Sequence, residues 1–236
     1  MAFLRSLLFS IVMIVVTVLI STLGILFLPT PFKFRWHIIR LWSVINLQAI
    51  KYICGINYEI TGKENIPDET AIIFSKHQST WETFALQQIF PPQVYVIKRE
   101  LLWIPFFGWG IAVLNPIAIN RSSGHSAIRQ VVEKGTARLK NGEWIVIFPE
   151  GTRVRPGEKK RYKMGGAILA AESGYPIVPV AHNAGYYWQK GQFIKKPGTI
   201  KVVIGPVINT KGRKPDEIIK DVEEWIESTM ERITIL

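Results

Sequence analysis

The stretch HQSTWE, residues 77 to 82, places a histidine five residues ahead of a carboxylate. A neutral imidazole can take a proton from a hydroxyl, while a nearby carboxylate fixes its tautomer and stabilises the imidazolium that forms. His77 and Glu82 are therefore candidates for a general base and its orienting partner. The four residues from Ser79 to Glu82 also match a capping box, in which Glu82 only satisfies a backbone amide at a helix start.

Seven β-rich runs alternate with helical ones after residue 55, which predicts an α/β fold. We expect a mixed, mostly buried sheet of about seven strands covered by helices, because several runs are apolar throughout. The runs cover residues 56–60, 70–75, 93–98, 116–120, 143–148, 176–181 and 199–205. Helices are predicted around 80–90, 126–142, 164–174 and 215–233, from apolar spacing and from terminal glycines, proline and acids.

The motif HQSTWE then falls on a strand-to-helix turn. Residues five apart on one helix differ by about 140° around its axis. His77 and Glu82 can therefore meet only if His77 precedes the first turn and bends back over it. Such a corner at the carboxyl end of a strand is where open α/β sheets commonly carry their sites.

The amino-terminal part of the chain has no charge between Ser6 and Phe32. Residues 7 to 28 would form a helix of about 33 Å, which is long enough to cross or deeply enter a bilayer. A cleaved signal peptide is the alternative, but its apolar part is shorter, about 7 to 15 residues, and ends in small residues.

A second, amphipathic helix follows two prolines and predicts an interfacial segment, with basic residues among aromatic ones. These basic and aromatic residues include Lys33, Arg35, Trp36, Arg40 and Trp42. We therefore expect residues 1–54 to anchor the protein in a membrane and residues 55–236 to form the α/β domain.

The net charge of the chain indicates which kind of partner it binds. Lys and Arg outnumber Asp and Glu by 29 to 18, for a formal net charge of +11, so an anionic partner is expected. Basic residues that follow the apolar segment outnumber Arg5 before it, which favours a cytoplasmic domain. The single cysteine, Cys54, excludes a disulfide framework and a cysteine metal site.

A second motif, FPEGTR at residues 148–153, gives the first one a context. Together with HQSTWE it resembles the glycerolipid acyltransferase family, which carries H-x4-D and F-P-E-G-T-R-S blocks. The stretches KRELLWIPFFGW, PIAINR and YPIVPVAHNAG resemble further blocks of that family in the same order. Two residues depart from the pattern: Glu82 stands where the family usually has aspartate, and Val154 where it often has serine.

The resemblance implies transfer of a fatty acyl chain from acyl-carrier protein or coenzyme A to lysophosphatidic acid, at the inner membrane of a bacterium. The acceptor could instead be glycerol 3-phosphate or another lysolipid. No G-x-S-x-G nucleophile elbow is present, so the acceptor hydroxyl itself would attack, with His77 as base and Glu82 as its partner. Amides at the helix start near Ser79 to Trp81 would face the developing negative charge. Neither a cofactor nor a metal is expected.

By the same resemblance, the substrate phosphate would be bound by Lys98, Arg121 and Arg153. Surface exposure without a ligand is the alternative for Lys98 and Arg121. The turn residues Glu150, Gly151 and Thr152 would support substrate binding or brace the loop.

Other residues have weaker assignments. The basic run from Arg155 to Lys163 is predicted to face membrane or solvent, and His182 is predicted to be structural or supporting. The apolar residues Trp103, Ile104, Phe106 and Phe107 are candidates to line an acyl channel or simply to pack in the core.

Three other functions stay open from the sequence. A membrane-anchored esterase would need an activated serine or cysteine. A lipid-binding protein without activity would not depend on His77. A nucleic-acid binder is the weakest alternative because no recognised module is present and the apolar segment would be unexplained, so no nucleic-acid partner is expected.

Overall fold

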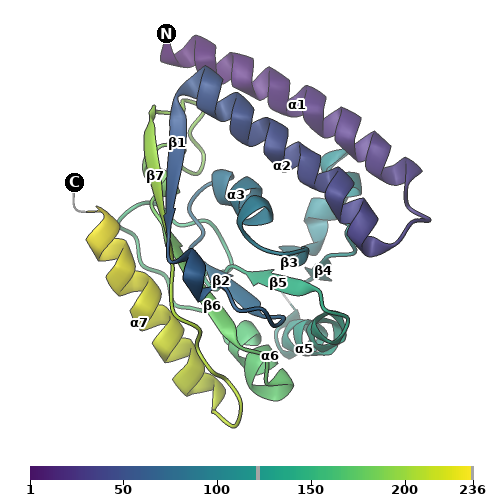
Figure 1. Cartoon of the computed structure of the whole chain (residues 1–236), viewed down its shortest axis with the longest axis vertical. Coiled ribbons are helices and arrows are strands. Elements are labelled where there is room, and N and C mark those ends of the chain that lie inside the picture. The colour runs from purple at the N-terminus through teal and green to yellow at the C-terminus, as the bar shows by residue number, and fades with distance from the viewer. Residues whose placement is uncertain (121–122, 235–236) are drawn as a thin grey trace.

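The computed structural model describes residues 1–120 and 123–234 and contains a seven-stranded sheet between two layers of helices (Figure 1). All seven predicted strands are present, with ends shifted by no more than about two residues. The strands are β1 (Ile56–Thr61), β2 (Ile72–Ser75), β3 (Gln93–Lys98), β4 (Ile117–Ile119), β5 (Trp144–Ile147), β6 (Ile177–His182) and β7 (Gly198–Ile204).

The predicted helices are also present, and the structure adds a short one. The helices are α1 (Ala2–Leu26), α2 (Phe32–Cys54), α3 (Trp81–Ile89), α4 (Phe107–Ala112), α5 (His125–Lys140), α6 (Gly165–Ser173) and α7 (Pro215–Thr234). Single 3-10 turns lie at η1 (Lys63–Asn65), η2 (Arg99–Trp103) and η4 (Ala184–Tyr186). The sequence did not predict η2 or α4, because residues 101–112 are apolar all round and interrupted by proline and glycines.

The strand order is β1-β7-β6-β2-β5-β3-β4. Neighbouring strands are parallel except β6 and β7, so the sheet is mixed, as predicted. The parallel strands β6, β2, β5, β3 and β4 therefore end at one edge of the sheet. Because β2 and β5 are neighbours, with Phe74 opposite Ile147, the segments that follow them start side by side.

Both faces of the central strands are buried, which explains their continuous apolar sequences. Alternate residues point to opposite sides, so Ile73 packs with α2 and α3 while Ile72 and Phe74 pack with α5, α6 and α7. The sheet thus separates two apolar cores, and the edge where the parallel strands end is left to carry the site.

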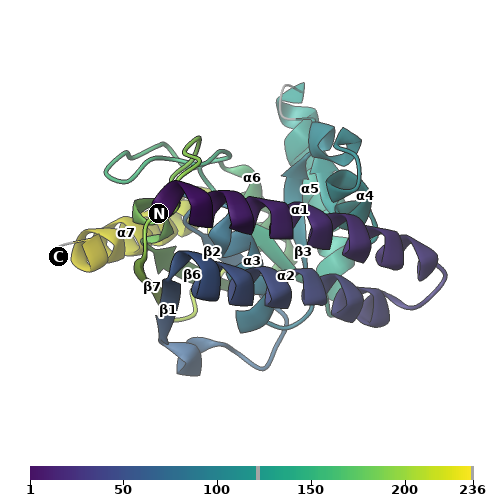
Figure 2. The same cartoon turned by 90° about the horizontal axis from the view of Figure 1, so that it is seen from above.

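The first two helices run side by side along one layer, as both views of the fold show (Figure 2). Of the described helices, α1 is the one that is long and apolar enough to cross a membrane. One side of α1 packs on the rest of the protein: Phe9 meets Trp188 edge to face at 5.5 Å, and Thr17 accepts a hydrogen bond from Trp42. A side chain at Gly110 of α4 would collide with Ser21, so glycine allows this close approach.

The second helix meets the prediction of an interfacial segment on one side only. Lys33 and Leu41 are exposed. Arg35 and Trp36 are buried instead, and Arg35 donates a 2.6 Å hydrogen bond to the carbonyl oxygen of Val113. The interfacial prediction is therefore wrong for these two residues, because their side of α2 packs against the segment that follows α4.

Candidate active site

His77 and Glu82 are in direct contact at the carboxyl end of β2. The Nδ1 atom of His77 lies 2.8 Å from Oε1 of Glu82. His77 precedes α3 and Glu82 lies in its first turn, so the histidine bends back over the helix start as the sequence predicts. When Nδ1 donates its proton to the carboxylate, the basic lone pair of the neutral ring lies on Nε2.

The two interpretations of Glu82 hold at the same time. Its carboxylate accepts hydrogen bonds from the backbone amides of Gln78 and Ser79, at 3.0 and 2.9 Å to Oε1. The same oxygen contacts His77, and the residue is 1% exposed. Glu82 therefore caps the helix start and orients the imidazole with one buried carboxylate.

The surroundings of Glu82 keep it ionised. Burial alone would raise its pKa, but the imidazoles of His182 and His77 and the guanidinium of Arg153 outweigh burial and hold the pKa below its usual range. A carboxylate that is charged at neutral pH can stabilise an imidazolium at His77.

The amides at the start of α3 are mostly used within the protein. The N–H of Ser79 donates to Glu82, and the N–H of Trp81 donates to the hydroxyl oxygen of Ser79 at 3.2 Å. The prediction that these amides face a reacting oxygen is therefore wrong for Ser79 and Trp81.

The turn after β5 closes over His77. The ring of Phe148 stacks on the imidazole with centroids 3.9 Å apart and planes inclined by 15°. The carbonyl oxygen of His77 accepts a 2.8 Å hydrogen bond from the amide of Val154. The two motifs, seventy residues apart in sequence, are thus joined by backbone bonding and ring packing.

Arg153 lies at the same cavity as His77, as the sequence predicts. Its side chain is half-buried, and its charge acts on the pKa of Glu82. A guanidinium with its fixed fork of donors suits phosphate oxygens. The candidate base His77 and the cation Arg153 therefore line the same cavity.

The other turn residues lie differently. Glu150 is 1% exposed and faces the buried ammonium of Lys76, at 3.3 Å, so the alternative of bracing the loop fits its position. Gly151 has φ +70°, a left-handed conformation that favours glycine. The Thr152 hydroxyl accepts a 3.3 Å hydrogen bond from Lys190.

Of the other two predicted phosphate ligands, Lys98 is not brought to Arg153 in the structure. Lys98 ends β3 with a side chain that is half exposed, lies 3.9 Å from Glu100, and is not among the residues lining the cavity at His77. Arg121 lies outside the described residues. Among the described residues, Arg153 is the predicted phosphate ligand that the fold brings to His77.

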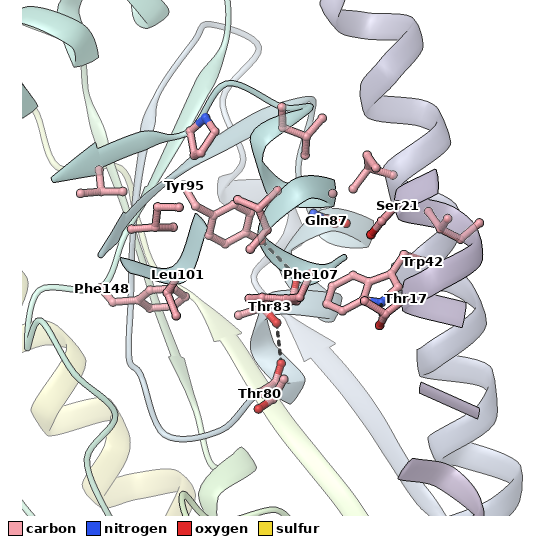
Figure 3. Close-up of a pocket in the computed structure, with 18 of the residues that line it drawn as sticks. Thr17, Ser21, Trp42, Thr80, Thr83, Gln87, Tyr95, Leu101, Phe107 and Phe148 are labelled. Atoms are coloured by element: carbon pink, nitrogen blue, oxygen red, sulfur yellow. Dashed lines mark hydrogen bonds between the residues drawn. The ribbon is translucent and has the colours of Figure 1, made fainter. Parts of the chain in front are cut away.

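An apolar cavity of about 150 Å³ is lined by His77 and Arg153 and by residues of the first two helices. Figure 3 shows Thr17 and Ser21 of α1 and Trp42 of α2 among the cavity walls. Most of the cavity walls could not be predicted from sequence, because α1, α2, α3 and β3 contribute residues that are distant along the chain. These walls include Thr17, Ser21, Trp42, Thr83, Gln87, Tyr95 and Leu101. Of the four residues proposed for an acyl channel, Phe107 alone lines this cavity, whereas Trp103 is 69% exposed.

His182 supports the site from the buried side. Its Nε2 lies 2.8 Å from the carbonyl oxygen of Lys76, and its Nδ1 accepts from the amide of Ala184 at 3.3 Å. Burial lowers its pKa, against the opposing effect of Glu82, and so favours the neutral ring. A neutral ring with Nε2–H satisfies both contacts, which assigns His182 a structural role.

The burial of Glu150 leads to a test of stability against pH. Burial raises the pKa of Glu150 from 4.5 to about 7, although Lys76 and nearby amides oppose the rise. Between these values the folded protein binds more protons than the unfolded chain, so stability falls as pH increases. We expect the stability of Glu150→Gln, relative to the parent, to rise by about 3 kcal/mol from pH 4.5 to pH 8.

The measurement is urea unfolding in detergent at both pH values. Glu231→Gln is the control, because Glu231 is exposed and its pKa is lowered by its partner Lys159. An unchanged difference between parent and Glu150→Gln at the two pH values would show that folding does not raise the pKa of Glu150.

Comparisons with known proteins agree with this geometry. The sequence profile of the family described as Acyltransferase matches residues 57–183, which include both motifs. A 1-acyl-sn-glycerol-3-phosphate acyltransferase from Pseudomonas aeruginosa is 43% identical over 235 residues, covering 98% of this chain and 91% of the relative. The alpha form of that enzyme from Mus musculus is 30% identical over 172 residues, which cover 71% of this chain and 60% of the mouse protein.

A solved structure has the same fold over the whole chain. The crystal structure of the 1-acyl-sn-glycerophosphate acyltransferase PlsC from Thermotoga maritima matches with a TM-score of 0.82 and 25% identity. The match covers 100% of this chain and 97% of that one, including the two amino-terminal helices. With both motifs assembled at one sheet edge and relatives matched over nearly its full length, the chain belongs to the acyltransferase family.

Proposed function

We propose that this protein transfers a fatty acyl group from an acyl thioester to the sn-2 hydroxyl of lysophosphatidate and so makes phosphatidate. The observation that carries the proposal is the His77–Glu82 pair, which shares an apolar cavity with Arg153. A lysolipid combines a hydroxyl, a phosphate and an acyl chain, and these need a base, a cation and an apolar space. The named activity of the Pseudomonas aeruginosa relative supports the same conclusion.

His77 would act as general base at Nε2. The acceptor hydroxyl oxygen attacks the thioester carbonyl carbon while His77 takes the hydroxyl proton. The tetrahedral intermediate then collapses, the carbon–sulfur bond breaks, and the imidazolium returns the proton to the leaving thiolate. The products are the diacylated phospholipid and a free thiol, and no covalent acyl-enzyme is required.

Glu82 would serve the chemistry twice. Its ionised carboxylate, 2.8 Å from Nδ1, fixes the tautomer that leaves Nε2 basic. It also offsets the positive charge that the ring carries between the two proton transfers. Phe148, stacked on the ring, restricts its rotation and supports the same orientation.

Arg153 is expected to bind the acceptor phosphate. A hydrogen bond to a charged group contributes about 1.5 to 3 kcal/mol, so Arg153→Ala should raise the KM for lysophosphatidate about 10- to 100-fold. The kcat at saturating acceptor should change less, because the phosphate is remote from the reacting carbonyl. Steady-state rates over a range of lysophosphatidate concentrations measure both constants.

The control for this variant is Arg155→Ala, which removes an exposed arginine two residues further along the same loop. We expect its KM to stay near that of the parent. An increased KM for the acyl donor with an unchanged KM for lysophosphatidate would instead assign Arg153 to the donor.

The reaction itself is tested by offering purified protein two donors and several acceptors. The donors are palmitoyl-coenzyme A and palmitoyl-acyl-carrier protein, and the acceptors are lysophosphatidate, glycerol 3-phosphate and lysophosphatidylcholine. Phosphatidate, identified by mass spectrometry, is the expected product with at least one donor. Release of free palmitate together with an acylated protein would support a membrane-anchored esterase instead.

The first two helices are proposed to hold this site at a lipid surface. Residues 1–54 would anchor the protein and residues 55–236 would carry out the transfer. The exposed apolar side of α1 and the walls that α1 and α2 give to the cavity support this division. The basic residues after the apolar segment favour the cytoplasmic side of a bacterial inner membrane.

A further inference from the structure

Lys76, the residue directly before His77, is almost completely buried between two carboxylates. It is 1% exposed, and its Nζ lies 2.6 Å from Oε1 of Glu227 and 3.3 Å from Oε1 of Glu150. Burial of an ammonium costs several kcal/mol unless close charges and hydrogen bonds offset it. The contacts with Glu227 and Glu150 offset this cost for Lys76.

The cluster joins three separate parts of the chain. Lys76 follows β2, Glu150 lies in the turn after β5, and Glu227 lies in α7. The hydroxyl of Tyr162 also donates a 2.8 Å hydrogen bond to the same oxygen of Glu227 that binds Lys76. The buried ammonium of Lys76 thus links α7 to the loop after β2 and to the loop after β5, which carry the candidate site.

A direct contact leads from this cluster to the proposed base. Oε1 of Glu150, which faces Lys76, is also 3.4 Å from the backbone nitrogen of His77. The carbonyl oxygen of His77 in turn binds the amide of Val154, next to Arg153. A shift of Glu150 would therefore move the main chain of His77 relative to the turn that carries Arg153.

We propose that Lys76 is a positioning residue for acyl transfer, which acts with Glu227 of α7 to hold His77 and the Arg153 turn in register. This inference rests on the proposed function. Lys76 does not line the cavity at His77 and does not contact the reacting atoms, so its effect passes through Glu150 and the backbone. Displacement of a base by about 1 Å can lower a rate about 100-fold.

The charges in this cluster predict that removing Lys76 and removing the charge of Glu227 shift the pKa of Glu150 in opposite directions. The groups that act on Glu150 are the ammonium of Lys76 and the backbone amides of His77 and Glu150 itself. On the far side of Lys76 lies Glu227 of α7, and the hydroxyl of Tyr162 is influenced by Glu150, Glu227 and Glu223 together. Removal of the Lys76 ammonium takes away the nearest positive charge and favours the protonated form of Glu150. Removal of the Glu227 charge leaves Lys76 to Glu150 alone and favours the ionised form.

The same helix offers a matched control pair. Lys159 and Glu231 form a second lysine–glutamate contact of 2.8 Å, with Glu231 one helical turn beyond Glu227. Their side chains are 64% and 65% exposed, so this contact bridges the same loop and helix without burial. Exposed pairs of this kind contribute little to stability.

The experiment compares Lys76→Met and Glu227→Gln with Lys159→Met and Glu231→Gln in full-length protein. We expect kcat to fall at least about tenfold in the first two variants and to change less than about twofold in the controls. The pH inflection of kcat that depends on Glu150, defined as the one absent in Glu150→Gln, should move up in Lys76→Met and down in Glu227→Gln. A purely structural defect would lower the amount of folded enzyme without moving an inflection in opposite directions.

The outcomes separate the two proposals. Thermal unfolding and size-exclusion profiles report whether each variant is folded, and Glu227→Gln keeps the inference testable if Lys76→Met does not fold. Parent-like kcat and pH profiles in a folded Glu227→Gln or Lys76→Met variant would overturn the positioning role. Absence of transfer to lysophosphatidate by the parent protein would instead overturn the proposed function.

Discussion

Replacement of His77 by alanine is expected to lower kcat for phosphatidate formation by about 100- to 10,000-fold, the usual contribution of a general base. The acceptor hydroxyl is a weak nucleophile, and no other described imidazole lies at the cavity to take its proton. His182 is buried and bonded through both ring nitrogens, so it does not substitute for His77. The rate of radiolabelled acyl transfer to lysophosphatidate measures the loss.

The control for this variant is His125→Ala, which removes an exposed histidine at the start of α5. Its kcat should equal that of the parent. The KM for lysophosphatidate should stay within a few-fold in His77→Ala, because Arg153 and the cavity are retained. A His77→Ala enzyme with a parent-like kcat would exclude the base mechanism even if the protein still made phosphatidate.

The assembly of the site was predictable in part from the order of elements. Both motifs follow apolar runs that read as buried strands, so both were expected at the carboxyl ends of strands. That β2 and β5 are neighbours in the sheet is set by tertiary packing, and no local pattern in the sequence encodes it. The contact between His77 and the turn of Arg153 therefore needed the structure.

The residues that line the cavity could not be predicted from the sequence for a different reason. Thr17 and Trp42 belong to helices whose composition predicted membrane contact, yet one side of each helix packs against the domain and faces the cavity. Composition gives the average character of a helix and does not tell which side meets protein. The segment with η2 and α4 shows no helical periodicity in its sequence, because its apolar residues face several directions.

Lys76 was overlooked because lysine is rarely buried, and the default expectation for it is a solvated side chain. Its place between a buried strand and a candidate histidine was the one available signal. Glu150 was expected either to support substrate binding or to brace the loop, because membership of the FPEGTR motif does not specify the direction of a side chain. In the structure its carboxylate is turned away from solvent toward Lys76.

Replacement of Glu82 by glutamine should lower kcat by about 100- to 10,000-fold, although the two side chains are nearly equal in size. Both carboxylate oxygens of Glu82 accept hydrogen bonds, from Gln78 and Ser79 at Oε1 and from Ser79 at Oε2. Whichever way the amide turns, its NH₂ group meets a backbone N–H donor. If NH₂ replaces Oε1, it also faces Nδ1 of His77 and favours the tautomer that carries its proton on Nε2, which cannot act as base.

Glu82→Asp separates charge from length in the same measurement. Aspartate keeps the negative charge and both acceptor oxygens but is shorter by one methylene, so the contact with Nδ1 lengthens from 2.8 Å unless the helix start moves. We expect its kcat to fall by about tenfold or less, since the charge and the tautomer are retained. Equal losses in the aspartate and glutamine variants would mean that reach, not charge, sets the role of Glu82. A glutamine variant as active as the parent would reduce Glu82 to a helix cap.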